Sequence, residues 1–457
     1  MGNIMTNPTH NFYGEIDFEY DVRPVTPQSK TLRSINTIIK ECEEYISQGL
    51  VKSSKDTVPS AILHKKEWQI ELENFRVDCG RISDDEIYMN NLKLIDLIPR
   101  GMCLMKLTKG DNTYYDMVTY ATRKFTGFND NDIDTQRPID YSLSINMLMD
   151  IPKLNTIVSM EKINGSAVNF SGRYIGDVFY LFVGSKNVRI LVNPYEDINV
   201  SLSAYKNDLR YTIPKKAAQL FINTWLQLNA EKQTKLAKWL HSTRGTIVGE
   251  ICLTSDQHIV LKYIDELYLF GITPPPSSDG FYRSYTLLDP LKTLEVFRSY
   301  GFKTPNYVEY TPWNEIYEDV YDMKTKRQTE GVVLYCMDLS DNVTNMIKLK
   351  TTWYILLRAI REKTKYHFHR RQIKNTPVRV IDTKIVKEDM RNRIRELTSY
   401  VSMPPDEMNE WLNKISDWVD FYVTYSNEHK IGNVKMIATF PKIWSDFIYN
   451  RRLEGLI

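Results

Sequence analysis

The stretch Ser-Met-Glu-Lys-Ile-Asn-Gly-Ser occupies residues 159–166 and places Lys162 three residues before Gly165. An Asn-Gly pair after a β-type run is typical of a turn, so Lys162 is expected at the end of a strand. A glycine at 165 would let a ligand approach the backbone closely. Four further segments follow in a fixed order, each in a β-type context, and they contain Lys186, Glu250, Glu330, and the pair Lys348 and Lys350.

The residue types in these segments suit covalent transfer of a nucleotide. A lysine becomes a nucleophile when neighbouring cations or burial lower its pKa. Lys348 and Lys350 stand two apart in a β-type run, so both should reach one pocket, where they can hold a phosphate and lower the pKa of Lys162. Glu330 is placed to bind a divalent metal ion, Mg²⁺ or Mn²⁺, and Glu250 to bind ribose hydroxyls.

The composition describes a globular protein of two or three domains. The chain has 457 residues, of which 42% are hydrophobic and 25% charged. It contains no run of 18 apolar residues that could span a membrane, and its first residues do not resemble a secretory signal. The five cysteines are scattered without a Cys-x-x-Cys pair, which favours reduced thiols, a cytoplasmic or nuclear location and no zinc site. Gly2 with Thr6 fits the minimal N-myristoylation pattern, although an ordinary N-terminus is the simpler interpretation.

Positive charge is concentrated toward the C-terminus. Residues 358–457 contain 19 Lys and Arg against 13 Asp and Glu, whereas the whole chain has 59 against 57. A basic C-terminal region suits contact with a nucleic-acid backbone, although a solvated helical surface explains the same excess.

The pattern of apolar residues predicts an α+β chain in three parts. Residues 1–95 form a mixed α/β extension with a helix at about 32–46. Residues 96–365 are dominated by β-type runs, interrupted by one helix at 215–241 and a second at 289–300. A helix is expected at 354–368, across the boundary, and residues 366–457 belong to a helical region with further helices at 385–400 and 406–425 and with Asp406 as an N-cap.

The ordered segments resemble the motifs of the covalent nucleotidyltransferase superfamily. Within it, the chain is most similar to ATP-dependent RNA ligases of the bacteriophage T4 RNA ligase 1 type and to the adenylyltransferase domain of fungal tRNA ligase. The resemblance runs from about residue 100 to 365. It implies an ATP-grasp-like ligase domain of antiparallel sheets with helices, followed by a small all-α C-terminal domain that binds RNA and sets specificity.

The resemblance also implies roles for individual residues. Lys162 would accept AMP, with Glu330 at the metal ion and with Lys348 and Lys350 at the phosphates. The nucleotide-binding residues would be Arg100, Gly165, Lys186, Glu250, Phe270, Lys348 and Lys350. The segment at 123–129 resembles an Arg…Lys-Phe-Phe-Asn segment of this ligase class, but Lys124 is displaced from the family's register.

The activity implied is sealing of RNA 5′-phosphate and 3′-hydroxyl ends through lysyl-AMP and an adenylylated RNA 5′ end. The cofactors would be ATP with Mg²⁺ or Mn²⁺, the substrates tRNA halves or other broken RNA ends, and the protein a monomer. Two alternatives stay open. An mRNA capping guanylyltransferase would need a following OB-fold, which the helical pattern does not favour. A catalytically inactive RNA-binding scaffold would not need the lysines and glutamates.

End-healing activities have little support in the sequence. No Gly-x-x-x-x-Gly-Lys-Ser/Thr segment of a P-loop kinase is present. The single His-x-Thr, at 241–243, lacks the second copy that a phosphoesterase of that kind needs, and it is interpreted as the end of a helix. His367 and His369 alternate on a basic segment and are interpreted as phosphate contacts rather than metal ligands.

Overall fold

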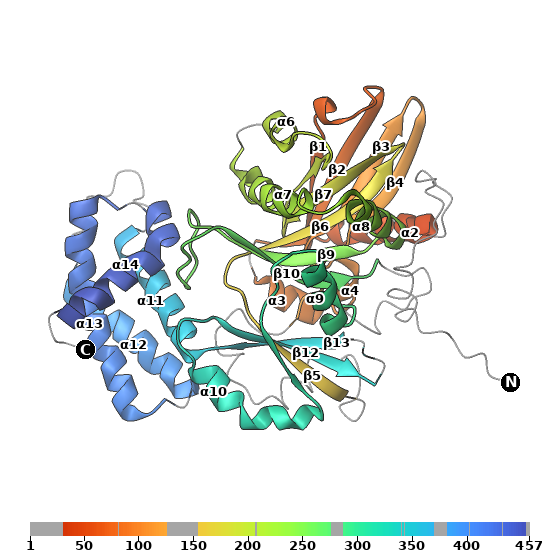
Figure 1. Cartoon of the computed structure of the whole chain (residues 1–457). Coiled ribbons are helices and arrows are strands. Elements are labelled where there is room, and N and C mark those ends of the chain that lie inside the picture. Colours follow the sequence, from red (N-terminus) through yellow and green to blue (C-terminus); the bar gives the residue numbers. More distant parts are fainter. Residues whose placement is uncertain are drawn as a thin grey trace.

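Figure 1 shows the computed structural model, in which three antiparallel sheets lie beside a bundle of helices. The structure describes residues 31–80, 82–125, 154–205, 208–275, 287–339, 341, 343–369, 382–401, 403–431 and 433–453. Gly2 and residues 126–129 of the segment at 123–129 lie outside these ranges. None of the helices in the described ranges has the length and apolar character needed to cross a membrane.

The first sheet has the order β1-β2-β3-β4, and every neighbouring pair is antiparallel. Its strands are β1 (Val51–Thr57), β2 (Trp68–Val77), β3 (Met102–Lys109) and β4 (Asn112–Thr119). Three helices share a hydrophobic cluster with it, namely α2 (Thr31–Ser47), α3 (Asp84–Asn90) and α4 (Lys93–Leu97). The helix predicted at 32–46 is therefore confirmed as α2. The sequence predicted a domain boundary between residues 95 and 96, but β2 lies before it and β3 after it, and the two strands pair in one sheet.

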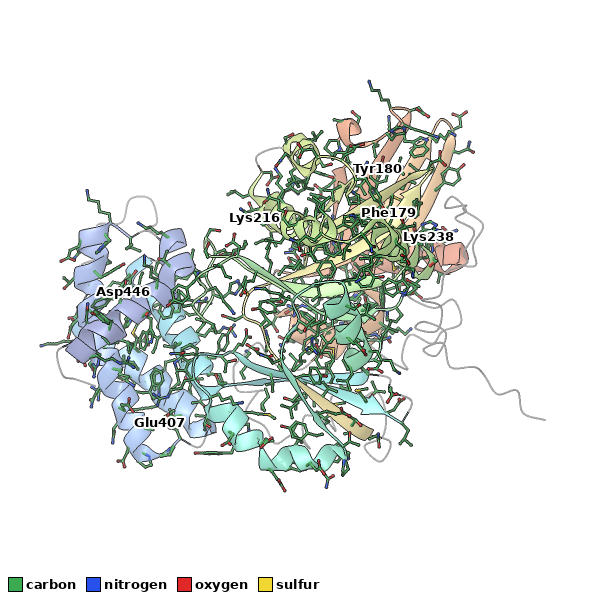
Figure 2. All side chains as sticks on the ribbon, viewed as in Figure 1. Phe179, Tyr180, Lys216, Lys238, Glu407 and Asp446 are labelled. Carbon is green, nitrogen blue, oxygen red and sulfur yellow. The ribbon has the colours of Figure 1, made fainter. Side chains whose placement is uncertain are left out.

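The second sheet has the order β10-β9-β6-β7-β8. Its strands are β6 (Ser166–Ile175), β7 (Val178–Ser185), β8 (Arg189–Val192), β9 (Thr246–Cys252) and β10 (Glu266–Thr273). Phe179 and Tyr180 of β7 are buried in the large core that this sheet forms with the first sheet (Figure 2).

Helices α6 (Ile198–Ala204), α7 (Thr212–Trp225) and α8 (Ala230–Thr243) pack on the second sheet. The single helix predicted at 215–241 is wrong, because the structure has two helices separated by residues 226–229. Asn229 begins the second one, since its side chain accepts a hydrogen bond from the Lys232 amide. A side chain that caps a new helix competes with continuation of the previous one.

The third sheet, of order β11-β5-β12-β13, brings distant segments to one edge. Its strands are β5 (Leu154–Glu161), β11 (Tyr307–Tyr310), β12 (Gly331–Asp338) and β13 (Val343–Lys350), with α9 (Pro290–Ser299) and α10 (Val320–Thr325) nearby. In the register, Val332 faces Glu161 and Gly331 faces Lys350. The end of β5, the start of β12 and the end of β13 therefore meet.

The chain ends in helices that pack around Trp418, which is fully buried among aromatic neighbours. They are α11 (Thr352–His369), α12 (Thr383–Val401), α13 (Pro405–His429) and α14 (Asn433–Leu453), at the left of Figure 1. The three predicted helices are confirmed, but α14 was not expected. Asp406 is not an N-cap: Pro404 takes that position and Pro405 starts the helix, which leaves Asp406 in the first turn.

The α+β class, with antiparallel sheets, helices and a helical C-terminal region, is confirmed by these elements. The domain boundary predicted between residues 365 and 366 stays a prediction. Residues from both sides of it contribute to the helical core, including Ile355 and Ile360 of α11 and Trp411 of α13.

A buried ion pair connects the first two sheets. Asp116 on β4 and Arg173 on β6 are almost completely inaccessible, and their side chains lie 2.8 Å apart. Arg244, after α8, also pairs with Asp116. The guanidinium of Arg173 additionally donates to the Met117 carbonyl. A buried cation of this kind is costly once its carboxylate is removed.

Replacing Asp116 with alanine should therefore lower the free energy of unfolding by about 3–5 kcal/mol, because Arg173 would stay buried without its carboxylate. Urea unfolding followed by tryptophan fluorescence would measure the change. Asp111, exposed in the β3–β4 turn, provides the matched control, and Asp111→Ala should change stability by less than about 0.5 kcal/mol. Equal effects of the two substitutions would contradict a structural role for the pair.

Candidate active site

A pocket of about 490 Å³ opens between the second and third sheets. All nine residues predicted from the sequence line it: Arg100, Lys162, Gly165, Lys186, Glu250, Phe270, Glu330, Lys348 and Lys350. They come from the loop before β3, the β5–β6 turn, the end of β7, strands β9, β10 and β13, and the residue before β12. The structure thus brings the predicted residues together, while their individual roles stay predictions.

Lys162 follows the last residue of β5, as the sequence predicted. Its amide donates to the Gly331 carbonyl at 2.8 Å, which holds it against the start of β12. Gly331 has a φ of 135°, and a Cβ there would come within 2.0 Å of the Leu349 carbonyl oxygen. Only glycine fits this position, so the close approach of three strands fixes where Lys162 meets Glu330.

Glu330 is buried and has two partners on the Lys162 turn. Its Oε1 lies 2.8 Å from Lys162 Nζ, and its Oε2 accepts a hydrogen bond of 2.6 Å from Asn164 Nδ2. Burial alone would raise the pKa of Glu330, but Lys162 lowers it below its usual value.

The pKa of Lys162 lies above its ordinary value. Burial alone would lower it, but the carboxylates of Glu330 and then Glu250 raise it. The expectation that Lys348 and Lys350 lower the pKa of Lys162 below its ordinary value is therefore wrong, because Glu330 makes the direct contact. Lys162 is an ammonium ion beside this carboxylate.

Glu250 lies inside β9 and faces the same turn. Its Oε1 accepts a hydrogen bond of 3.2 Å from the Gly165 amide. A Cβ at residue 165 would come within 2.2 Å of the Ile251 carbonyl oxygen, so Gly165 is needed for this contact. Burial raises the pKa of Glu250 to about 7, although Lys162 opposes the shift.

Lys348 and Lys350 face the pocket from β13, as their spacing predicted. Burial, together with the positive charges of Lys350 and Arg100, lowers the pKa of Lys348 to about 7. The Lys348 ammonium lies 5.6 Å from the centre of the Phe125 ring, and that of Lys350 lies 5.9 Å from the centre of the Tyr354 ring. Both lysines thus combine a buried stem with a charge near the pocket.

Arg100 is positioned by the glycine that follows it. Gly101 has a φ of 106°, and a Cβ there would come within 2.8 Å of the Arg189 guanidinium. That buried guanidinium donates to the Gly101 carbonyl, to Asn74 Oδ1 at 2.7 Å and to Asn169 Oδ1 at 3.2 Å. Arg189 therefore connects β2, β3 and β6 beneath Arg100.

Asp84 is a residue that the sequence analysis missed. It begins α3, where its carboxylate lies 3.3 Å from Lys124, 3.4 Å from Lys186 and 3.9 Å from Arg100. Burial would raise the pKa of Asp84, but these cations lower it to about 2. Lys124 is displaced from its position in the family's motif, but its side chain contacts the same carboxylate as Lys186 and Arg100. The sequence offers only a helix start after Ser83 as a signal for this position.

Two histidines that the sequence analysis singled out, His241 and His367, contact other side chains or the backbone in the structure. His241 Nδ1 accepts a hydrogen bond of 3.0 Å from the Tyr174 amide, as expected for a residue at the end of a helix. His367 Nε2 lies 2.7 Å from Asp389 Oδ2, which Lys363 also contacts. Within the ranges that the structure describes, no group of three or more His, Cys, Asp or Glu side chains could hold a metal ion by itself.

The family model for RNA ligases of the T4 RNA ligase 1 type matches residues 99–354, which is more than half of the chain. The chain therefore belongs to this family of RNA ligases. No curated protein matches it significantly in sequence.

Solved structures with similar arrangements are distant. An archaeal ATP-dependent RNA ligase is 13% identical with a TM-score of 0.43, covering 86% of this chain and 80% of its own. A putative ATP-dependent DNA ligase from Aquifex aeolicus is 13% identical with a TM-score of 0.42, covering 86% and 80%. A variant of Naegleria gruberi RNA ligase with ATP and manganese is 11% identical with a TM-score of 0.31, covering 67% of this chain and 98% of its own.

Replacing Asp84 with asparagine should destabilise the protein by about 2 kcal/mol near neutral pH, the free energy that corresponds to the lowered pKa. The folded pKa is below the unfolded one, so the contribution is complete above about pH 4 and is lost as the pH falls toward about 2. Urea unfolding between pH 3 and pH 7 would follow the difference from the unmodified protein.

Asp177→Asn, in the exposed β6–β7 turn, is the control and should leave stability unchanged at every pH. If the effect of Asp84→Asn did not shrink on acidification, the three cations would not be what stabilises the carboxylate.

Proposed function

We propose that this chain is an ATP-dependent RNA ligase that forms a covalent AMP adduct on Lys162. One observation supports this most strongly: Lys162 forms an ion pair with Glu330 in a pocket that Lys348, Lys350, Arg100 and Lys186 also line. A nucleophile beside a ring of cations suits attack on a polyphosphate.

In the first step, the Lys162 amine attacks the α-phosphorus of ATP. A phosphorus–nitrogen bond forms, the bond to the β-phosphate oxygen breaks, and pyrophosphate leaves. Lys162 is an ammonium ion beside Glu330, so it must first lose a proton, which the Glu330 carboxylate 2.8 Å away is placed to accept. Lys348 and Lys350 are placed to offset charge on the transferred phosphate.

A divalent cation fits the chemistry of this pocket. Glu330 and Glu250 supply carboxylate oxygens, and Mg²⁺ commonly binds one or two carboxylates together with substrate phosphates. Glu330 would be its principal protein ligand. When bound, Mg²⁺ or Mn²⁺ would neutralise phosphate charge during transfer.

The later steps transfer AMP to an RNA 5′-phosphate and then join that end to a 3′-hydroxyl. The basic excess after residue 358 supports contact of the C-terminal helices with the RNA backbone. Substrates would be broken RNA ends such as tRNA halves, consistent with a role in RNA repair or tRNA splicing.

The alternatives are less well supported. A capping guanylyltransferase would need an OB-fold after the nucleotidyltransferase domain, but α11–α14 follow β13. An inactive scaffold gives no reason for Lys162, Glu250, Glu330, Lys348 and Lys350 to line one pocket. Labelling with α-labelled ATP and GTP in parallel separates the three functions, since the ligase should prefer ATP and a scaffold should take neither.

Lys162→Ala should abolish covalent labelling of the protein by α-labelled ATP with Mg²⁺, because the accepting amine is removed. Labelled protein on a denaturing gel provides the measurement, and circular dichroism checks the fold. Lys216→Ala is the matched control, since Lys216 is exposed on α7 (Figure 2) and is not one of the residues that line the pocket. Label that persists in Lys162→Ala would show that another residue carries the nucleotide.

ATP binding should take up a proton at Lys348. Its pKa is about 7, and a bound phosphate would raise it, so ATP affinity should fall as the pH rises above 7. Titration calorimetry in two buffers of different ionisation enthalpy, in the Lys162→Ala background, would count protons without transfer. Lys348→Met should remove most of the uptake. Unchanged uptake in that variant would assign the proton to another group, such as Glu250.

A further inference from the structure

The loop between β9 and β10 is embedded in the C-terminal helices. Ile259 is 2% exposed and belongs to the hydrophobic core of α11–α14. The Gln257 amide donates to the Ala438 carbonyl on α14 at 3.1 Å, and Arg361 on α11 donates to the His258 carbonyl at 3.3 Å. The position of this loop therefore depends on how the helices are packed.

The same loop contacts the turn that carries Lys162. The amides of Ile259 and Val260 both donate to Asn164 Oδ1, each at 2.9 Å. The other end of that amide, Nδ2, donates to Glu330 Oε2 at 2.6 Å, and Glu330 Oε1 contacts Lys162. A single buried side chain thus lies between the helical core and the reactive pair.

An amide is needed for this arrangement. Asparagine accepts two hydrogen bonds at its oxygen and donates at its nitrogen, whereas an ionised aspartate only accepts. An aspartate at 164 would place a second carboxylate beside the buried Glu330 and would lose the donated bond. An alanine would leave the two loop amides and Glu330 Oε2 without this partner, at a cost that burial increases.

We propose that Asn164 is a positioning residue through which the contact of the β9–β10 loop with the helices α11–α14 sets the geometry of Lys162 and Glu330. The helical region is then required for AMP transfer to Lys162, in addition to any contact with RNA. This inference rests on the proposed function, because it assumes that Lys162 is the residue that accepts AMP.

The test compares two substitutions that make similar cavities in the same core. Ile259→Ala alters the loop, and Ile394→Ala removes an equally buried isoleucine on α12, far along the chain from the loop. Both should lower the melting temperature. Ile259→Ala should slow single-turnover labelling of Lys162 at saturating ATP by about tenfold, with a less than about twofold change in the ATP concentration for half-maximal rate. Ile394→Ala should label at the rate of the unmodified protein.

Asn164 variants provide the second measurement, which leaves the helical core untouched. Asn164→Ala and Asn164→Asp should each slow labelling by at least the factor seen for Ile259→Ala, and the double variant Ile259→Ala with Asn164→Ala should be no slower than Asn164→Ala alone. If Ile259→Ala does not fold, the labelling rates of the Asn164 variants test the proposed role of Asn164.

The outcomes are distinguishable. If the unmodified protein takes no label from ATP, the proposed function fails and this inference fails with it. If the unmodified protein is labelled but Ile259→Ala matches Ile394→Ala, or the effects of Ile259→Ala and Asn164→Ala multiply, only the coupling through Asn164 is overturned.

Discussion

The buried carboxylate of Glu330 sets the main constraint on this structure. A charge at this depth is tolerated only with close partners, and Lys162 and Asn164 supply them from the β5–β6 turn. This contact requires β5 and β12 to pair in one register, and Gly331 allows β13 to close on the same corner. The arrangement of the third sheet and the chemistry of the pocket therefore depend on one another.

Around that carboxylate, the pocket has an excess of positive charge. Arg100, Lys186, Lys348 and Lys350 converge from three parts of the fold, the loop before β3, the residue after β7 and strand β13, and burial together with the neighbouring cations lowers the pKa of Lys348. Asp84 faces the cations at one side, with its carboxylate shared between Arg100, Lys124 and Lys186. A polyphosphate would supply the negative charge that the rest of the pocket lacks. The electrostatic balance of the pocket residues thus favours anions of this kind.

The sequence predicted nine of the residues that line the pocket because each stands in a short segment that resembles a motif of the ligase family. Spacing was sufficient for Lys348 and Lys350, whose separation of two residues puts both on one face. Asp84 could not be found in this way, since its partners Arg100, Lys124 and Lys186 come from three separate segments that only the folded chain brings together. The hydrogen bonds that Asn164 accepts at its side-chain oxygen and donates from its side-chain nitrogen also depend on tertiary contacts. Among the helices, α14 was missed because Pro441 lies within it, a residue that usually ends a helix.

The first sheet has a consequence for how such a protein can be shortened. Strands β1 and β2 complete a sheet whose other half, β3 and β4, belongs to the region matched by the ligase family. A fragment that began after β2 would expose the backbone amides and carbonyls of β3 along their whole length. Unpaired edges of this kind promote association between chains. A minimal ligase cut from this chain would therefore need a substitute strand, or a charged or proline-containing edge, to remain monodisperse.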